Sequence, residues 1–162
     1  MSLPRLRACW IAVGVAAACL TQATGFAQQA PPQGEMQQAG PGGDPHAAEE
    51  LAAERQALGF LGYLDHGRFA DSYAYTGMLI RTQLDRDGFA TQIEKTRVGT
   101  GALQSRDLID ASYATTVPGA PAGQYVVLNY RSSFGNRADE AVETLTLAFA
   151  NGYWRVSGYY IK

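Results

Sequence analysis

Residues 141–161 read AVETLTLAFANGYWRVSGYYI, and this stretch decides the fold of the chain. At its centre, Asn151-Gly152 is the pair that a two-residue type I′ turn favours, because both positions need a positive φ angle. The segments on either side alternate apolar and polar residues and are rich in β-branched and aromatic side chains. The sequence therefore predicts a β-hairpin with strands over 141–150 and 153–161.

The tight turn also determines which residues face each other across the hairpin. The register places Phe149 opposite Trp154 and, continued without interruption, Glu143 opposite Tyr160. One face is then apolar except at its far end, where Glu143 lies. The apolar side chains of that face are Leu145, Leu147, Phe149, Trp154 and Val156, and the other face carries Thr144, Thr146, Ala148, Arg155, Ser157 and Tyr159.

Two more strands are expected before the hairpin, over 103–117 and 124–134, because hydrophobicity there also has a period of two. The turn sequences PGAPAG (118–123) and GNRAD (135–139) separate the segments. In the second of these strands, one face carries Val126, Leu128, Tyr130 and Phe134. Four consecutive antiparallel strands make a meander.

Three helical segments are expected before the strands. The first begins at Asp44-Pro45 and ends at Gly67, the second begins at 68 with a weak point at Gly77, and the third begins at Asp85 or Asp87 and ends at the turn over 99–101. The expected inward residues are Leu51, Leu58, Leu61 and Leu64, then Phe69, Tyr73 and Leu84, then Phe89, Ile93 and Arg97. The predicted fold class is α+β, with three N-terminal helices packed on a four-stranded antiparallel meander.

The first 27 residues are typical of a secretory signal peptide. Arg5 and Arg7 precede an apolar run over 8–20, and the small residues Gly25 and Ala27 mark a cleavage site after Ala27. The run is shorter than the roughly 20 residues that a membrane-spanning helix needs. We therefore expect a protein exported to the periplasm or secreted, without a transmembrane span.

A second possibility for the leader is a lipoprotein signal. The sequence AAAC over 16–19 loosely resembles a lipoprotein cleavage box, in which case Cys19 would carry a lipid and anchor the protein. With cleavage after Ala27 instead, Cys9 and Cys19 are both removed. The mature chain would then have no disulfide and no thiol nucleophile.

The segment 28–43, QQAPPQGEMQQAGPGG, is predicted to be a disordered linker because it has almost no large apolar residues. The remaining 44–162 forms a single predicted domain. Loss of two of the 13 basic residues with the leader leaves 11 against 15 acidic residues, a net charge of −4. Nucleic acid is therefore not an expected partner.

The sequence offers few groups for catalysis or cofactors. Outside the leader there is no cysteine, and the two histidines, His46 and His66, are too few for a zinc site. No G-x-S-x-G sequence supplies a nucleophile. We predict no metal, no cofactor and no catalytic residue.

Glu143 is the least ordinary residue, because the register places its carboxylate among apolar neighbours. A buried charge without partners costs several kcal/mol. The candidate partners are the hydroxyl of Tyr160 and the guanidinium groups of Arg97 and Arg106. Three arrangements are possible: a salt bridge that ties the sheet to the helices, a Glu143 side chain that reaches solvent, or a polar floor in a ligand pocket. For the last of these, the predicted ligand-binding residues are Glu143, Tyr160, Arg97 and Arg106.

The chain also resembles a known bacterial family over about residues 48–162. The resemblance rests on Leu64-Asp65, Gly67, Arg97, Gly99, Ser105-Arg106, PGAPAGQYVV over 118–127, ETLTL over 143–147 and WRVSGYYI over 154–161. By these residues it is similar to the domain of unknown function 4019, with Phe89 where a tryptophan is expected. The order of elements resembles a cystatin-like or nuclear-transport-factor-2-like roll. The resemblance implies this fold and export, and no activity.

Three functions follow from these observations. The leading one is a non-catalytic periplasmic domain that binds a small ligand or an envelope protein, with the oligomeric state left open. The second is an isomerase, dehydratase or hydrolase that uses Glu143 or Asp65. The third is an assembly module acting through an exposed outer sheet face with Tyr125, Val127 and Tyr159. A cavity between helices and sheet favours the first, and a carboxylate locked to an arginine argues against the second.

Overall fold

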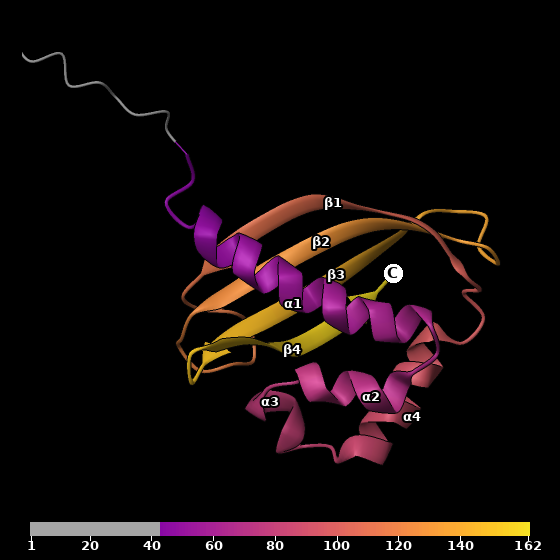
Figure 1. Cartoon of the computed structure of the whole chain (residues 1–162), viewed down its shortest axis with the longest axis horizontal. Helices are drawn as coiled ribbons and strands as arrows, with labels where there is room; N and C mark the ends of the chain where they lie inside the picture. Colours follow the sequence, from indigo (N-terminus) through magenta and orange to yellow (C-terminus); the bar gives the residue numbers. More distant parts are fainter. Residues whose placement is uncertain (1–42) are drawn as a thin grey trace, which may run out of the picture. The chain divides into compact units, whose positions relative to one another are not determined.

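The computed structural model describes residues 43–162; the predicted signal peptide and the predicted linker up to 42 lie outside this range. One long helix, α1, crosses one face of a curved sheet, and the shorter helices gather beside strand β4 (Figure 1). The helices are α1 (Ala47–Asp65), α2 (Phe69–Ser72), the 3₁₀ helix η1 (Tyr73–Tyr75), α3 (Met78–Arg81) and α4 (Arg86–Arg97). The strands are β1 (Leu103–Ala114), β2 (Tyr125–Phe134), β3 (Ala141–Ala150) and β4 (Tyr153–Ile161).

All four strands pair in the order β1-β2-β3-β4, each antiparallel to the next. The predicted α+β class, with helices on a four-stranded antiparallel meander, is confirmed. Strands β1 and β4 form the two edges of the sheet. None of the helices within residues 43–162 combines the length and the apolar character needed to cross a bilayer.

Helix α1 ends in a glycine-dependent cap. Gly67 has φ +69°, a conformation that glycine adopts without strain. The Gly67 amide donates to the Leu64 carbonyl at 3.0 Å, and the Arg68 amide donates to the Tyr63 carbonyl at 2.9 Å. This is a Schellman motif, which stops the helix at the predicted glycine.

The buried face of α1 differs from the predicted leucine stripe. Leu61 and Leu64 are buried as predicted, but Leu51 and Leu58 are 49% and 47% exposed. The alanines Ala53 and Ala57 are buried instead, and their small side chains let the helix backbone approach the strands closely. The buried residues of α1 are Ala53, Ala57, Phe60, Leu61 and Leu64.

The predicted second helix is broken into α2, η1 and α3. The break lies at the predicted weak point, Gly77, whose amide donates to the Val156 carbonyl of β4 at 2.8 Å. Thr76 also forms a parallel bridge with Val156. The helix is interrupted because this segment satisfies the exposed edge of β4 instead.

The last helix, α4, follows the prediction closely. The Asp85 side chain accepts a hydrogen bond from the Gly88 amide at 2.8 Å, which caps the helix. Phe89, Ile93 and Arg97 are buried at spacings of four residues. This periodicity brings Arg97, the last residue of α4, to the same interior as the two apolar side chains.

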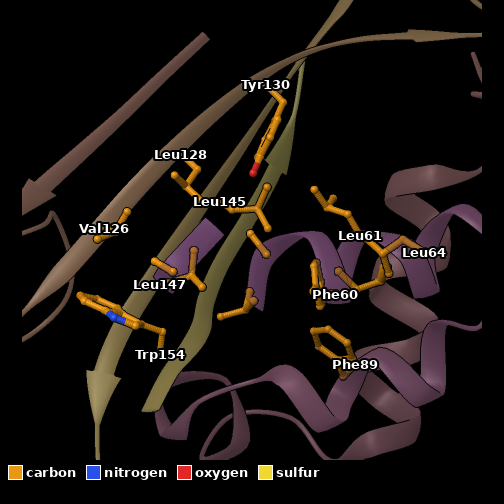
Figure 2. Packing of buried hydrophobic residues seen from close by; sticks show 14 residues of the cluster. Phe60, Leu61, Leu64, Phe89, Val126, Leu128, Tyr130, Leu145, Leu147 and Trp154 are labelled. Carbon is orange, nitrogen blue, oxygen red and sulfur yellow. The ribbon is translucent and has the colours of Figure 1, made fainter. Parts of the chain in front are cut away.

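The helices and one face of the sheet enclose the apolar core (Figure 2). Phe60 and Leu61 of α1 and Phe89 of α4 face the alternating residues of β2 and β3. The inward residues of the sheet include Val126, Leu128, Tyr130, Leu145, Leu147, Trp154 and Val156, as the two-residue periodicity predicts.

The turn of the final hairpin forms as predicted. Asn151 and Gly152 have φ angles of 54° and 82°, the positive values that a type I′ turn needs. Phe149 pairs with Trp154, and their rings lie 5.2 Å apart between centroids, on one face of the sheet. The predicted register therefore holds next to the turn.

Farther from the turn, the register shifts by one residue. Leu147 pairs with Val156, but Thr146 pairs with Gly158, so Ser157 is the extra residue of a β-bulge. Because side chains alternate with a period of two, one extra residue exchanges the faces of all residues beyond it.

The prediction that Tyr160 lies opposite Glu143 is therefore wrong. Glu143 pairs with Ile161 and Tyr160 pairs with Thr144, on the face away from the helices. Tyr160 is 59% exposed. Its neighbour Tyr159 turns inward instead, where its ring packs against Phe60 with 5.8 Å between centroids.

The expected outer face with exposed Tyr125, Val127 and Tyr159 is also wrong. Tyr125 is buried, and its hydroxyl donates to the Pro121 carbonyl at 2.7 Å. The chain after β1 folds over this end of the sheet and covers it. Val127 is half-buried, and Tyr159 faces the helices because of the bulge.

Candidate functional site

Four charged side chains form a closed ring beneath the ends of the helices. Arg97 bonds Glu143 through Nη1 at 2.9 Å and Asp65 through Nη2 at 2.6 Å. Arg106 bonds Glu143 through Nε at 2.8 Å and Asp65 through Nη1 at 2.6 Å. Each arginine therefore connects the same two carboxylates, and we call this set the ion ring.

Elements far apart in the sequence supply the ion ring. Asp65 is the last residue of α1, Arg97 is the last residue of α4, Arg106 belongs to β1 and Glu143 to β3. All four side chains are largely buried, and that of Glu143 is fully buried. The ring therefore ties both long helices to the sheet.

Glu143 has additional partners besides the arginines. The Ser132 hydroxyl donates to its Oε1 at 2.6 Å, and the Tyr159 hydroxyl donates to its Oε2 at 2.6 Å. Arg97 also lies over the ring of Phe134, 4.6 Å from the centroid. A buried carboxylate with this many donors is fully compensated, which is the condition under which a protein tolerates such a charge.

The surroundings of the ion ring raise the pKa values of Arg106 and Tyr159. Burial alone would lower the pKa of Arg106, but the hydrogen bonds and charges of Asp65 and Glu143 outweigh burial and raise that pKa above its ordinary value. Burial, together with the negative charge of Glu143, raises the pKa of Tyr159. Arg106 therefore stays protonated and Tyr159 stays neutral at physiological pH.

The structure brings three of the four predicted site residues together. Glu143, Arg97 and Arg106 meet in the ion ring, while Tyr160 lies outside it and Tyr159 takes the expected place. A ligand-binding role for these four residues stays a prediction. The sequence reasoning missed Asp65 and Ser132 as partners, although Ser132 shares the two-residue alternation of Tyr130 and Phe134.

A cavity of about 510 Å³ lies at the edge of the sheet formed by β4, next to the bulge. We call it the β4 cavity. The sheet contributes a row of three paired residues, Val127, Thr146 and Gly158, on the face opposite the core. The other walls come from α3, α4 and the loop over 117–120. Their apolar side chains include Leu79, Ile80, Leu84, Phe89, Ile93 and Val117.

The polar groups of the β4 cavity are all uncharged. They belong to Gln83, Gln92, Thr146, Ser157 and Tyr159, and the cavity has no Asp, Glu, Lys, Arg or His among its lining residues. Tyr159 connects the cavity with the ion ring, since the residue lines the cavity while its hydroxyl bonds Glu143.

A smaller hollow of about 340 Å³ reaches the ion ring at Asp65 and Arg97. The terminal amino groups of Arg97 already bond carboxylates. An anion entering here would have to displace Asp65, which makes this hollow a poor anion site. Within residues 43–162, no three His, Cys, Asp or Glu side chains converge as a metal site.

Residues 56–159 match a protein family described as a protein of unknown function, DUF4019. The chain belongs to this family. The match runs from the middle of α1 to Tyr159 and so includes every residue of the ion ring. The family resemblance predicted from the sequence is thus confirmed for this DUF4019 chain.

A search of curated proteins finds no match to this DUF4019 chain. Among solved structures, it is similar to a crystal structure from Novosphingobium aromaticivorans DSM 12444, a protein provisionally assigned as a scytalone dehydratase. The two chains are 13% identical, with a TM-score of 0.44. The alignment covers 71% of this chain and 83% of the other.

Proposed function

We propose that the protein is a non-catalytic binding domain that takes a small molecule into the β4 cavity. The observation that carries this proposal is the cavity itself. Its volume of about 510 Å³ falls in the range of roughly 300–1,000 Å³ that is usual for small-molecule sites. A mostly apolar wall with a few polar groups is also usual for such sites.

The chemistry of the neighbouring groups supports binding rather than catalysis. General acid–base catalysis needs a group that exchanges a proton near neutral pH. The lining residue Tyr159 bonds Glu143, and Glu143 and its neighbour in the ion ring, Asp65, are each held by two arginines. Tyr159, the titratable residue of the lining, has a pKa raised by burial and by Glu143, so it keeps its proton.

The construction of the walls also supports a preformed binding site. The floor is part of the hydrogen-bonded sheet, and the α4 wall carries the buried core residues Phe89 and Ile93. Such a wall does not have to be ordered when the ligand enters, which lowers the entropic cost of binding.

Binding can be tested with N-phenyl-1-naphthylamine, an uncharged dye that fluoresces in apolar surroundings. We expect saturable binding to the purified protein. Ala120 lies in the cavity wall, and Ala120→Trp should weaken binding at least tenfold by filling the space. Ala138→Trp, in the exposed β2–β3 loop, is the matched control and should bind within twofold of the wild type.

A second filling variant guards against a misfolded Ala120→Trp protein. Val127→Phe fills the same cavity from the sheet side and should also weaken binding. Circular dichroism and thermal melting check that each variant is folded. The absence of saturable binding to the wild type, or unchanged binding by both folded filling variants, would overturn the proposal.

We propose further that the binding domain acts after export, in the periplasm or outside the cell. The arginines, the short apolar run and the small residues before position 28 support this location. The intact mass of protein purified from an expressing bacterium tests it. A chain that begins at Gln28 supports a free exported protein, a lipidated Cys19 supports a membrane-anchored one, and an uncleaved chain contradicts export.

A further inference from the structure

We infer that the β4 cavity selects an uncharged, largely apolar molecule and rejects an ion of similar shape. This inference deepens the proposed function and rests on it. It concerns the class of ligand, and it comes from the charges and hydrogen-bonding groups that surround the cavity.

The first argument is the state of the polar groups in the wall. The Gln83 amide donates to the Leu79 carbonyl at 2.9 Å, and the Ser157 hydroxyl donates to the Thr146 carbonyl at 3.0 Å. The Tyr159 hydroxyl donates to Glu143. Each of these three groups therefore already donates one hydrogen bond within the protein.

Two further polar side chains of the wall are available to a ligand. Among the described residues, neither the Gln92 amide nor the Thr146 hydroxyl makes a side-chain hydrogen bond to another protein group across the cavity. Each can donate and accept, and neither carries a charge. They therefore fit a hydroxyl, carbonyl or amide group of a ligand whose remaining surface is apolar.

The second argument is that the cavity offers an ionic ligand no opposite charge. An ion that leaves water for an apolar cavity loses several kcal/mol of hydration unless the protein provides an opposite charge. Over residues 43–162, no charged side chain lines the cavity, and the lining residue Tyr159 bonds the ion ring, which contains two arginines and two carboxylates. These four charges sum to zero and are bonded to each other, so they offer no counter-ion.

A pair of dyes with one ring skeleton tests the inference. N-phenyl-1-naphthylamine is uncharged, and 8-anilinonaphthalene-1-sulfonate carries an added sulfonate. We expect the uncharged dye to bind at least tenfold more tightly, and Ala120→Trp to remove that binding. Equal or tighter binding of the sulfonate dye in the same cavity, also lost in Ala120→Trp, overturns the inference while the proposed function stands. If neither dye binds, the proposed function itself fails.

Adding a positive charge to the wall separates charge from size. Gln92 is exposed on α4 and lines the cavity, so Gln92→Arg should be tolerated and should provide a counter-charge. We expect the ratio of sulfonate-dye to uncharged-dye affinity to rise at least tenfold. Gln104→Arg, an exposed position on β1 outside the cavity, adds the same charge and should leave the ratio within twofold. An unchanged ratio in Gln92→Arg would show that charge does not determine selection.

Discussion

The Tyr159 hydroxyl donates a hydrogen bond of 2.6 Å to Glu143 Oε2, and the bulge at Ser157 makes this contact possible. Without the extra residue, Tyr160 would face inward and Tyr159 would face solvent. The same tyrosine lines the β4 cavity. A single irregularity in an edge strand thus determines both a partner of the ion ring and a wall of the proposed binding site.

Removal of the Tyr159 hydroxyl should destabilise the protein. A hydrogen bond to a charged group contributes about 1.5–3 kcal/mol, so Tyr159→Phe should lower the free energy of unfolding by about that amount. Tyr160→Phe removes the same atom from an exposed neighbour and should change the free energy of unfolding by less than about 0.5 kcal/mol. Urea unfolding followed by circular dichroism measures both, and equal effects would contradict the assigned register.

Neutralising Glu143 should be more costly. Glu143→Gln leaves Arg97 and Arg106 with one carboxylate between them, and breaking a buried pair typically costs about 3–5 kcal/mol. Glu140→Gln is the control, because Glu140 is exposed and lies 3.5 Å from the exposed Arg131. That change should cost less than about 0.5 kcal/mol. A loss below about 0.5 kcal/mol for Glu143→Gln, in thermal or urea unfolding, would mean that the ion ring does not stabilise the fold.

Stability should fall in alkaline solution because of Tyr159. Burial and the charge of Glu143 raise the pKa of Tyr159 above its ordinary value of 10.0. Above pH 10 the unfolded chain loses this proton while the folded chain keeps it, so the stabilisation is complete below pH 10 and declines above it. The slope is up to about 1.4 kcal/mol per pH unit for this tyrosine.

Urea unfolding between pH 8 and 11 measures this alkaline decline. Tyr130 adds to it, because burial and the charge of Glu54 raise its pKa as well. Tyr159→Phe should make the decline shallower, whereas Tyr160→Phe should not. Identical slopes in these two variants would show that Tyr159 ionises equally in the folded and unfolded chains.

Two glycines of α1 should respond differently to alanine. A Cβ at Gly62 meets no atom within 4 Å, so Gly62→Ala should stabilise the protein by about 0.5–1 kcal/mol through helix propensity. A Cβ at Gly59 would lie 2.6 Å from the Tyr75 ring, which must move. Gly59→Ala should therefore gain less or destabilise. Melting temperatures of the two variants compare them, and equal gains would show that Tyr75 does not restrict this face of α1.

The sequence alone predicts the parts of the fold that depend on neighbours in the chain. The positive φ angles of Asn151 and Gly152 and the cap at Gly67 are local effects, and each holds in the structure. The sequence predicts that Asp85 or Asp87 begins the last helix, and Asp85 provides the cap. For the same reason, the alternation of residues in β2 and the four-residue spacing in α4 identified the core residues.

Features that depend on distant segments escaped prediction. The Gly77 amide, from a segment about 80 residues away, bonds the Val156 carbonyl next to the bulge, and no local pattern in β4 signals this contact. The close approach of α1 to the sheet depends on Ala53 and Ala57, which a search for leucines overlooks. The ion ring was predicted in part because Glu143 and Arg97 lie on apolar faces, whereas Asp65 at a helix end gave no such signal.

Methyl NMR of isoleucine-labelled protein tests the central claim most directly. Ile80 and Ile93 line the β4 cavity, and Ile109 lies on β1, outside the lining. Addition of N-phenyl-1-naphthylamine should shift the methyl resonances of Ile80 and Ile93 in a saturable way and leave that of Ile109 unchanged. Shifts confined to Ile109, or none at saturating dye, would contradict a binding site at the edge of β4.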